Sequence, residues 1–365
     1  YICILKKLKY HKVNQSDNKR KSAIKRDKLF NISLCYIIFC VAISVFAYFF
    51  ILDKTPHSDN QMIELAIKSP GYSVDILSIS NIKDESKFKL RELFYGKKNT
   101  STEIPITTYE AKGDTVYYTT IDGNENFHIL NNDEKFEVKH RKFIFGTDRY
   151  GRDVFSRLVL GTRVSLSIGA VSVILSLLIG VIIGSAAGYY RGWVDKFLLW
   201  LINVVWAIPS VLLVIAISFA LGRGFWQVFI AIGFTLWVDV ARMVRGQVIS
   251  IKEMEYVDAA KVLGYNSLRI IGKHILPNIV SPLIVLSASN FATAILLEAG
   301  LSFLGIGVQP PMASWGMMIK EGYSYLILGH PYLSIIPGIA IMFLVLAFMI
   351  LGNSLRDALD VKTKN

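Results

Sequence analysis

Six stretches of this chain are apolar over about the length that a helix needs to cross a lipid bilayer, and no other feature limits the possible fold as strongly. The hydrocarbon core is about 30 Å thick, so a spanning helix needs about 20 apolar residues. The chain is 53% hydrophobic and only 19% charged, which is more apolar than a typical soluble domain. We predict an all-α integral membrane protein with six transmembrane helices. The predicted spans are Ile32–Leu52, Val164–Tyr190, Phe197–Leu221, Phe225–Ala241, Ile279–Leu304 and Leu333–Leu351.

The first window, residues 32–52, is expected to stay in the protein as an N-terminal anchor. Its apolar run is longer than that of a signal peptide, and the sequence AYFFILDKTP that follows has no small-x-small cleavage site. The chain has three cysteines, Cys3, Cys35 and Cys40. None lies in the large loop after the first span, so no disulfide framework is predicted there.

The distribution of basic residues predicts the orientation. Residues 1–31 contain ten lysines or arginines and two acidic residues, which places this basic tail in the cytoplasm by the positive-inside tendency. Six crossings then return the C-terminal segment, residues 354–365, to the cytoplasmic side. Residues 53–163 fall outside and carry 17 basic and 17 acidic residues. The net charge of +12 is therefore explained by membrane orientation and by anionic lipid, and nucleic acid is not an expected partner.

The loop at residues 53–144 is predicted to be a small α+β insert outside the membrane. QMIELAIKS has helix-like apolar spacing, whereas DTVYYTTIDGNENFHIL is typical of a β-hairpin that turns at Asp122-Gly123-Asn124. The insert could contact a delivering protein, or it could be a tolerated surface insertion. Gly180, Gly184 and Gly188 form a small-xxx-small series that predicts close helix packing, either as a moving contact or as plain tight packing.

The stretch EYVDAAKVLGYNSLRIIGKHILPNI, residues 255–279, is charged and amphipathic although it lies between apolar spans. Apolar residues at helical spacing (Tyr256, Ala259, Ala260 and Leu263) predict one face of a short helix. Gly264 is suited to a left-handed helix end, and Asn266 or Ser267 can cap a second helix. Leu268, Ile271 and Ile275 should share a face of that second helix. Two short helices at the cytoplasmic membrane surface are therefore expected.

The order of residues in this stretch resembles the coupling loop of ATP-binding-cassette importer permeases. The pattern there is Glu-Ala-Ala, three residues, Gly, nine residues, then Ile-x-Leu-Pro. The residues that take its fixed places are Asp258, Ala259, Ala260, Gly264, Leu276 and Pro277. Asp258 replaces Glu and His274 replaces Ile, which leaves the helix spacing intact. The alternative is a plain amphipathic helix on the membrane surface.

Three further segments resemble the dipeptide, oligopeptide and nickel permeases within that family. They are FGTDRYGRDVFSRLVLGTRVSLSIG at 145–169, LLEAGLSFLGIGVQPPMASWGMMIKEG at 296–322, and LGNSLRDALD near the C-terminus. The resemblance implies a five-helix permease core at residues 145–353, with a coupling loop at 243–278, in a bacterial cytoplasmic (inner) membrane. The resemblance also assigns ATPase coupling to Glu255 and to the six residues of the coupling-loop pattern. The cargo that it implies is a peptide or, alternatively, nickel or a nickel chelate.

The same resemblance implies the partners. The sequence contains no G-x-x-x-x-G-K-[ST] phosphate loop, so this chain is not expected to be an enzyme, and ATP hydrolysis is expected on two ABC ATPase subunits. A second homologous permease would complete the pore, and an external substrate-binding protein would deliver cargo. No catalytic group, cofactor or metal site is expected.

Charged residues within the apolar segments leave two interpretations open. Glu298 lies in the fifth window and is either a pore or gate group or a structural hydrogen-bond partner, since a carboxylate in lipid is costly. Asp239, Arg242 and Arg245 predict a local ion-pair network that anchors the end of the fourth span, with a role in gating as the alternative. Two other functional classes compete with the importer: a secondary transporter without ATPases, which an inverted repeat would favour, and a membrane-tethered receptor that functions through the insert.

Overall fold

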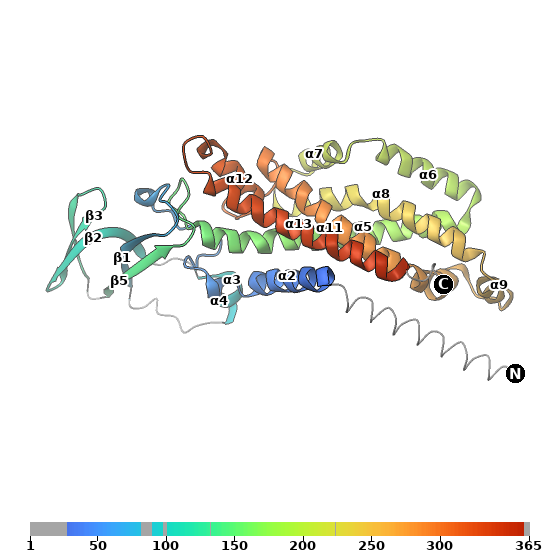
Figure 1. The fold of residues 1–365 in the computed structure, drawn as a ribbon, viewed down its shortest axis with the longest axis horizontal. Helices are drawn as coiled ribbons and strands as arrows, with labels where there is room; N and C mark the ends of the chain where they lie inside the picture. The colour runs from blue at the N-terminus through green and yellow to red at the C-terminus, as the bar shows by residue number, and fades with distance from the viewer. Residues whose placement is uncertain (1–27, 82–89, 98–100, 132, 223, 361–365) are drawn as a thin grey trace. The chain divides into compact units, whose positions relative to one another are not determined.

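The computed structural model describes residues 28–81, 90–97, 101–131, 133–222 and 224–360 (Figure 1). The predicted basic tail lies outside the described residues except for its last four residues, as do Cys3 and residues 361–365 of the predicted C-terminal segment. The described residues divide into two compact units. The helical unit contains residues 28–39, 167–298 and 342–360, and the mixed unit contains residues 40–166 and 299–341.

Five helices in the described residues are long and apolar enough to cross a membrane. Each contains or overlaps a predicted window, which confirms the helical membrane fold. They are α2 (Lys28–Val45), α5 (Val154–Tyr190), α8 (Phe225–Lys252), α11 (Leu276–Leu304) and α13 (Tyr332–Asp360).

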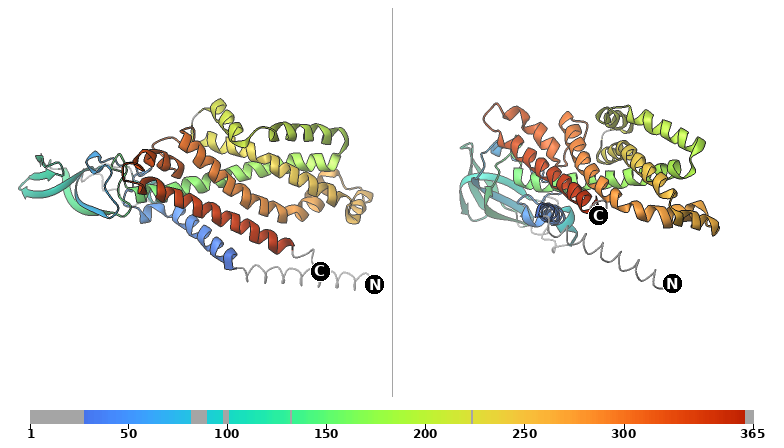
Figure 2. Two further views of the ribbon diagram at one scale, coloured as in Figure 1. Left: turned by 45° about the horizontal axis from the view of Figure 1, so that its top comes forward. Right: turned by 45° about the vertical axis from the view of Figure 1, so that its right-hand side comes forward.

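The third predicted span, residues 197–221, is not one straight helix. The chain forms α6 (Gly192–Trp206) and α7 (Ser210–Leu221), which are bent by 92° at the break between them. Pro209 stands directly before α7 with an extended backbone, and proline disfavours helical geometry in the residue before it. Both helices contact α8 in the helical unit (Figures 1 and 2). The described residues therefore contain six spans only if this bent pair counts as one.

The predicted close packing of the glycine series is confirmed on α5 and α8. A Cβ atom added to Gly180 would lie 2.5 Å from the Val240 Cβ, and one added to Gly184 would lie 2.5 Å from the Ala241 carbonyl oxygen. The two backbones approach so closely because these positions carry no side chain. In the same unit, the rings of Phe291 in α11 and Phe348 in α13 stack with centroids 4.0 Å apart.

The insert in the mixed unit is built on a five-stranded antiparallel sheet of order β4-β3-β2-β1-β5 (Figure 1). The strands are β1 (Tyr72–Asn81), β2 (Thr102–Lys112), β3 (Thr115–Thr120), β4 (Glu125–Ile129) and β5 (Glu134–Phe143). The predicted hairpin is confirmed as β3 and β4, with Gly123 at φ 81° in the turn. The helix expected in QMIELAIKS is wrong beyond one 3-10 turn (η1, Ile63–Leu65), because Leu65 packs into the sheet core and the next segments extend.

The rest of the mixed unit surrounds the start of α5. It includes α3 (Ala47–Phe50), α4 (Leu90–Tyr95), α12 (Trp315–Gly322) and the 3-10 turn η4 (Tyr323–Tyr325). Arg163 of α5 donates to the carbonyl oxygens of Ser44, Val45 and Phe94, at 2.8, 3.2 and 2.7 Å. The last turn of a helix leaves carbonyl groups without partners in the helix, so this arginine satisfies the end of α2 and ties α4 to it.

Candidate functional site

The segment between α8 and α11 forms two short helices, as predicted. The first is α9 (Glu255–Val262) and the second is α10 (Ser267–Ile270), which continues through a π-helical turn, η3 (Ile271–Ile275), into α11. Residues 253–275 are called the α9–α10 loop below. Gly264 has φ 78°, and the N–H of Tyr265 donates to the Ala260 carbonyl oxygen at 3.2 Å, which confirms the left-handed helix end. Asn266 caps α10 by accepting a hydrogen bond from the Arg269 N–H at 3.0 Å.

One side of the α9–α10 loop is built into the core of the helical unit. Val257 and Ala260 of α9 are buried together with Ile270, Ile271 and Ile275. The same apolar cluster contains residues of three long helices. These are Tyr189 of α5, Val240, Val244, Val248 and Ile251 of α8, and Ile279 of α11. The loop is therefore packed against the ends of three helices rather than hanging free.

The apolar face predicted for α9 is partly wrong. Ala260 is buried, but Tyr256, Ala259 and Leu263 are exposed, and Val257 takes the inner position instead. In the second helix Ile271 and Ile275 are buried as expected, but Leu268 is 74% exposed. The sequence could not decide this because α9 carries apolar residues on more than one side, and only the packing shows which side the core covers.

An exposed apolar surface results from this arrangement. The loop surface is defined as Met254, Tyr256, Ala259, Val262, Leu263 and Leu268. Val262 is 88% exposed and Leu263 is 70% exposed. A contiguous apolar surface that polar residues border is typical of a protein contact. The sequence reasoning missed Val262, although its position one turn after Asp258 places it on the outer side.

Charged groups border the loop surface and fix the neighbouring helix ends. Asp258 pairs with Lys261 at 2.6 Å on α9, and Glu255 is exposed at its first turn. Lys252, at the end of α8, donates to the Tyr189 carbonyl oxygen at the end of α5 at 2.5 Å. Of the remaining pattern residues, Leu276 is half-buried at the start of α11 and Pro277 is exposed beside it.

The ion-pair network predicted for α8 has other partners than expected. Arg245 forms a bidentate pair with Asp195 of α6, at 2.6 and 2.8 Å, rather than with Asp239, which is exposed. Arg242 donates to the Asn203 side-chain oxygen at 2.8 Å, and its guanidinium lies 3.9 Å from the Trp206 ring centroid. The network therefore joins α8 to α6 through residues that are 39 and 50 positions apart, a contact that the sequence could not show. Glu298 of α11 is fully buried.

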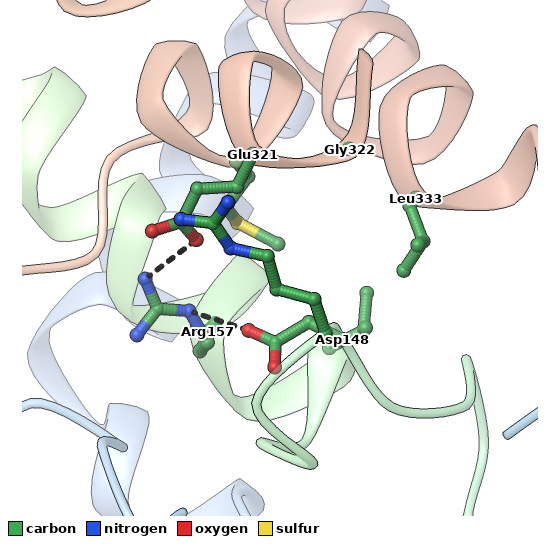
Figure 3. A pocket seen from close by; sticks show the side chains of 8 residues that line it. Asp148, Arg157, Glu321, Gly322 and Leu333 are labelled. Carbon is green, nitrogen blue, oxygen red and sulfur yellow. Dashed lines mark ion pairs between the residues drawn. The ribbon is translucent and has the colours of Figure 1, made fainter. Parts of the chain in front are cut away.

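A second polar cluster, which the sequence reasoning did not identify, lies in the mixed unit. Arg152 donates to Asp148 at 2.7 Å, to Asp59 at 2.9 Å and to Glu321 at 2.6 Å. Arg157 of α5 lies near the same three carboxylates, at 3.7 to 3.8 Å. Figure 3 shows its ion pairs with Asp148 and Glu321. These five residues are called the arginine cluster. Both arginine side chains are 2% exposed.

The arginine cluster joins three segments that are far apart in the sequence. Asp59 follows α3, Asp148 lies in the turn before α5, and Glu321 is in α12. Gly151 in that turn has φ 72°, and a Cβ atom there would lie 1.7 Å from the Met62 carbonyl oxygen, so only glycine fits. The sequence did contain a signal for this cluster. TDRYGRDVFSR places five charged side chains directly before an apolar span, and burying charged groups is costly unless they find partners.

The two segments that resemble peptide permeases pack together here. Trp315 of α12 donates its indole N–H to the Leu158 carbonyl oxygen of α5 at 2.8 Å. A Cβ atom added to Gly161 of α5 would lie 2.5 Å from the Trp315 ring, so the glycine makes room for the indole. The arginine cluster and this tryptophan contact therefore fix α12 to the first turns of α5. Among the described residues, no group of three or more His, Cys, Asp or Glu residues could hold a metal ion.

The sequence profile described as "Binding-protein-dependent transport system inner membrane component" matches residues 180–365. This range contains α6, α8 and the α9–α10 loop together with α11 and α13. The chain belongs to this family. It is therefore a multi-pass component of a binding-protein-dependent transport system, and the predicted family is confirmed.

Individual relatives narrow the comparison. The chain is 41% identical over 220 residues to the glutathione transport system permease protein GsiD of Pectobacterium atrosepticum, which covers 60% of this chain and 73% of that protein. It is 42% identical over 220 residues to the dipeptide transport system permease protein DppC of Bacillus subtilis, covering 60% and 69%. It is 40% identical over 237 residues to the oligopeptide transport system permease protein OppC of the same organism, covering 65% and 76%.

A solved structure of the MetNI methionine ABC transporter in an inward-facing conformation also aligns with this chain. The TM-score is 0.47 at 19% identity, and the alignment covers 56% of this chain and 97% of that chain.

Proposed function

We propose that this chain is the pore-forming permease subunit of an ATP-driven peptide importer and that the loop surface receives the ATPase. The observation that carries the proposal is the exposed apolar loop surface, which stands on a buried cluster shared by α5, α8 and α11. The relatives named for dipeptide, oligopeptide and glutathione transport support a peptide cargo.

The buried side of the α9–α10 loop supports a mechanical role. A packed apolar interior has low compressibility and transmits a displacement to its neighbours. A partner that moves α9 would therefore move the adjoining ends of three long helices together. Two nucleotide states of an ATPase that bind the loop surface differently would then shift the permease between two conformations. Glu255, Asp258, Ala259, Ala260, Gly264, Leu276 and Pro277 are proposed to form or support this contact.

The proposed assembly contains two ABC ATPase subunits, a second homologous permease and an external substrate-binding protein. Both termini and the α9–α10 loop are proposed to lie in the cytoplasm of a bacterium, since the tail, Lys252, Lys261, Arg269 and Lys273 are basic. The insert at residues 53–144 would lie outside, and residues 145–353 would form the permease core. Glu298 is proposed as a pore or gate group, because a fully buried carboxylate among membrane helices is rarely kept without a role.

The experiment that tests the proposal is purification of the full chain from its native membrane, with identification of the proteins that remain bound. The wild type should retain two ATPases and a sister permease, whereas the Ala259→Arg variant should lose the ATPases and keep the permease. Ala111→Arg, which also changes an exposed alanine but on strand β2, is the matched control and should retain all partners. A wild-type chain that purifies alone would overturn the proposal in favour of a secondary transporter.

A further inference from the structure

A polar cleft of about 840 Å³ opens in the mixed unit between one face of the sheet and the segment that follows α3. Alternate residues of β5 share the face that lines it, and the register pairs Lys135 with Ser80 and Glu137 with Ser78 of β1. The other end of the same face carries Val74 and is covered by an apolar cluster. The sheet face is thus divided into a covered apolar half and an open polar half.

The floor of the cleft is held in place by its own ion pairs. Arg141 forms a bidentate pair with Glu103, and these side chains are only 15% and 10% exposed. Asn60 donates to the same carboxylate at 2.5 Å, and Lys139 pairs with Glu137 at 2.8 Å. These charges neutralise one another, so the floor offers fixed polar groups rather than a net attraction for an anion.

Two lysines at the side of the cleft have no such partner. Within the part of the chain that the structure describes, Lys54 and Lys97 form no ion pair, and both are exposed. They are neighbours, because the Lys97 N–H donates to the Lys54 carbonyl oxygen at 2.8 Å. A Cβ atom at Gly96 would lie 2.7 Å from that oxygen, so glycine permits the approach. The two lysines place two positive charges at one edge of the cleft.

The same edge carries exposed aromatic side chains. Phe49 and Phe50 line the cleft and are 73% and 56% exposed. They belong to α3, which begins two residues after the apolar span α2 ends. Phe94 and Tyr95 of α4, which contacts α3, are exposed as well. Exposed aromatic residues at the end of a span are typical of the membrane–water interface, where their rings lie among the lipid headgroups.

From this combination we propose that the cleft binds the headgroup of an anionic phospholipid from the leaflet that the α2 end reaches. The lipid phosphate would lie between Lys54 and Lys97, and its acyl chains would pass along Phe49 and Phe50. Glycerol hydroxyls of the headgroup can hydrogen-bond to Ser78, Ser80 and the carboxylates of the floor. This chemistry favours phosphatidylglycerol over zwitterionic phosphatidylcholine. The site would tie the insert to the membrane surface, a role independent of the proposed ATPase contact.

The test is native mass spectrometry of the full chain in mild detergent during titration with phosphatidylglycerol or phosphatidylcholine. The wild type should bind phosphatidylglycerol more tightly. The double variant Lys54→Gln/Lys97→Gln should lose affinity by about 25-fold, because each lysine near an anionic lipid contributes about fivefold. Its binding of phosphatidylcholine should be unchanged. Lys142→Gln is the matched control and should leave both affinities intact, since Lys142 is exposed on β5 on the face opposite to Lys135, Glu137 and Lys139.

Phe49→Ser tests the proposed acyl-chain contact. Loss of the ring should weaken binding of both lipids equally, because both lipids carry acyl chains. The monodispersity of each variant in detergent shows whether it has folded. Equal binding of the two lipids by the wild type, or retention of phosphatidylglycerol by the folded double variant, would overturn the proposal. Displacement of the lipid by millimolar inorganic phosphate or by a short peptide would also overturn it, since the cleft would then be a site for a soluble ligand.

Discussion

Replacement of Arg152 by methionine should be among the most damaging single changes in the mixed unit. Arg152 donates to three carboxylates at 2.6 to 2.9 Å, and its side chain is 2% exposed. Methionine keeps most of the apolar stem but removes these three hydrogen bonds, so Asp59, Asp148 and Glu321 keep only the longer contacts of 3.7 to 3.8 Å with Arg157 in place of the arginine pair. Loss of one partner from a buried ion pair costs about 3–5 kcal/mol, because the remaining charge stays desolvated.

The second arginine of the cluster provides an internal comparison. Arg157 lies 3.7 to 3.8 Å from the same carboxylates, and two of its nitrogen atoms, Nε and Nη1, have no hydrogen-bond partner. Arg157→Met should therefore cost less than Arg152→Met, since the short hydrogen bonds remain. Arg149→Met changes an exposed arginine of the same turn, and surface substitutions of this kind alter stability by less than about 0.5 kcal/mol.

The assay is the free energy of unfolding of the purified chain in mixed micelles, measured by titration with a denaturing detergent. A double-mutant cycle with Glu321→Gln isolates the contact between α12 and the turn before α5, and residues in direct contact couple by about 0.5–3 kcal/mol. An unfolding free energy that falls no more in Arg152→Met than in Arg149→Met would contradict this prediction. An equal loss of unfolding free energy in Arg157→Met and Arg152→Met would also contradict it, since the distances would then not predict the energies.

Three further predictions concern the glycines and one histidine. Gly264→Val should lower peptide uptake per ATP hydrolysed without unfolding the bundle, because a β-branched residue at φ 78° costs more than about 1 kcal/mol and would distort the end of α9. Equal uptake per ATP hydrolysed by wild type and variant in liposomes would contradict this prediction. Gly184→Ala should destabilise the chain by about 1–3 kcal/mol, because the added Cβ overpacks against α8. Gly246→Ala should stabilise it by about 0.5–1 kcal/mol, because a Cβ atom there meets nothing within 4 Å. The two melting temperatures should therefore move in opposite directions, and a shift in the same direction would contradict the packing explanation. Burial, with a contribution from Arg157, lowers the pKa of His57 below its usual value, although Asp59 opposes the shift. The unfolded chain then binds a proton at higher pH than the folded chain, so stability is lost as pH falls through about 6.5. His57→Asn should remove this part of the pH dependence. Wild-type melting curves that are identical at pH 7.5 and pH 5.5 would show that the histidine does not contribute.

The structure supports several predictions that depend on local chemistry. Gly264 ends α9 because it can take a positive φ, and Asn266 caps α10 because its side chain reaches the Arg269 N–H. The hairpin of β3 and β4 follows from the turn chemistry at Asp122-Gly123-Asn124. Each of these depends on residues within a few positions of one another, which is why sequence reasoning could reach them.

The sequence by itself determined the membrane fold, because in lipid a chain must satisfy its backbone hydrogen bonds within each segment, so long apolar runs become helices. It also determined the presence of the α9–α10 loop, since Gly264 and the caps at its helix ends act locally. Only the tertiary structure decided which side of α9 is covered, because α9 carries apolar residues on both sides and the core covers Val257 and Ala260. Only the tertiary structure joined Asp59, Asp148 and Glu321 around Arg152, because electrostatic partners are chosen by proximity in space and these residues are distant in the chain.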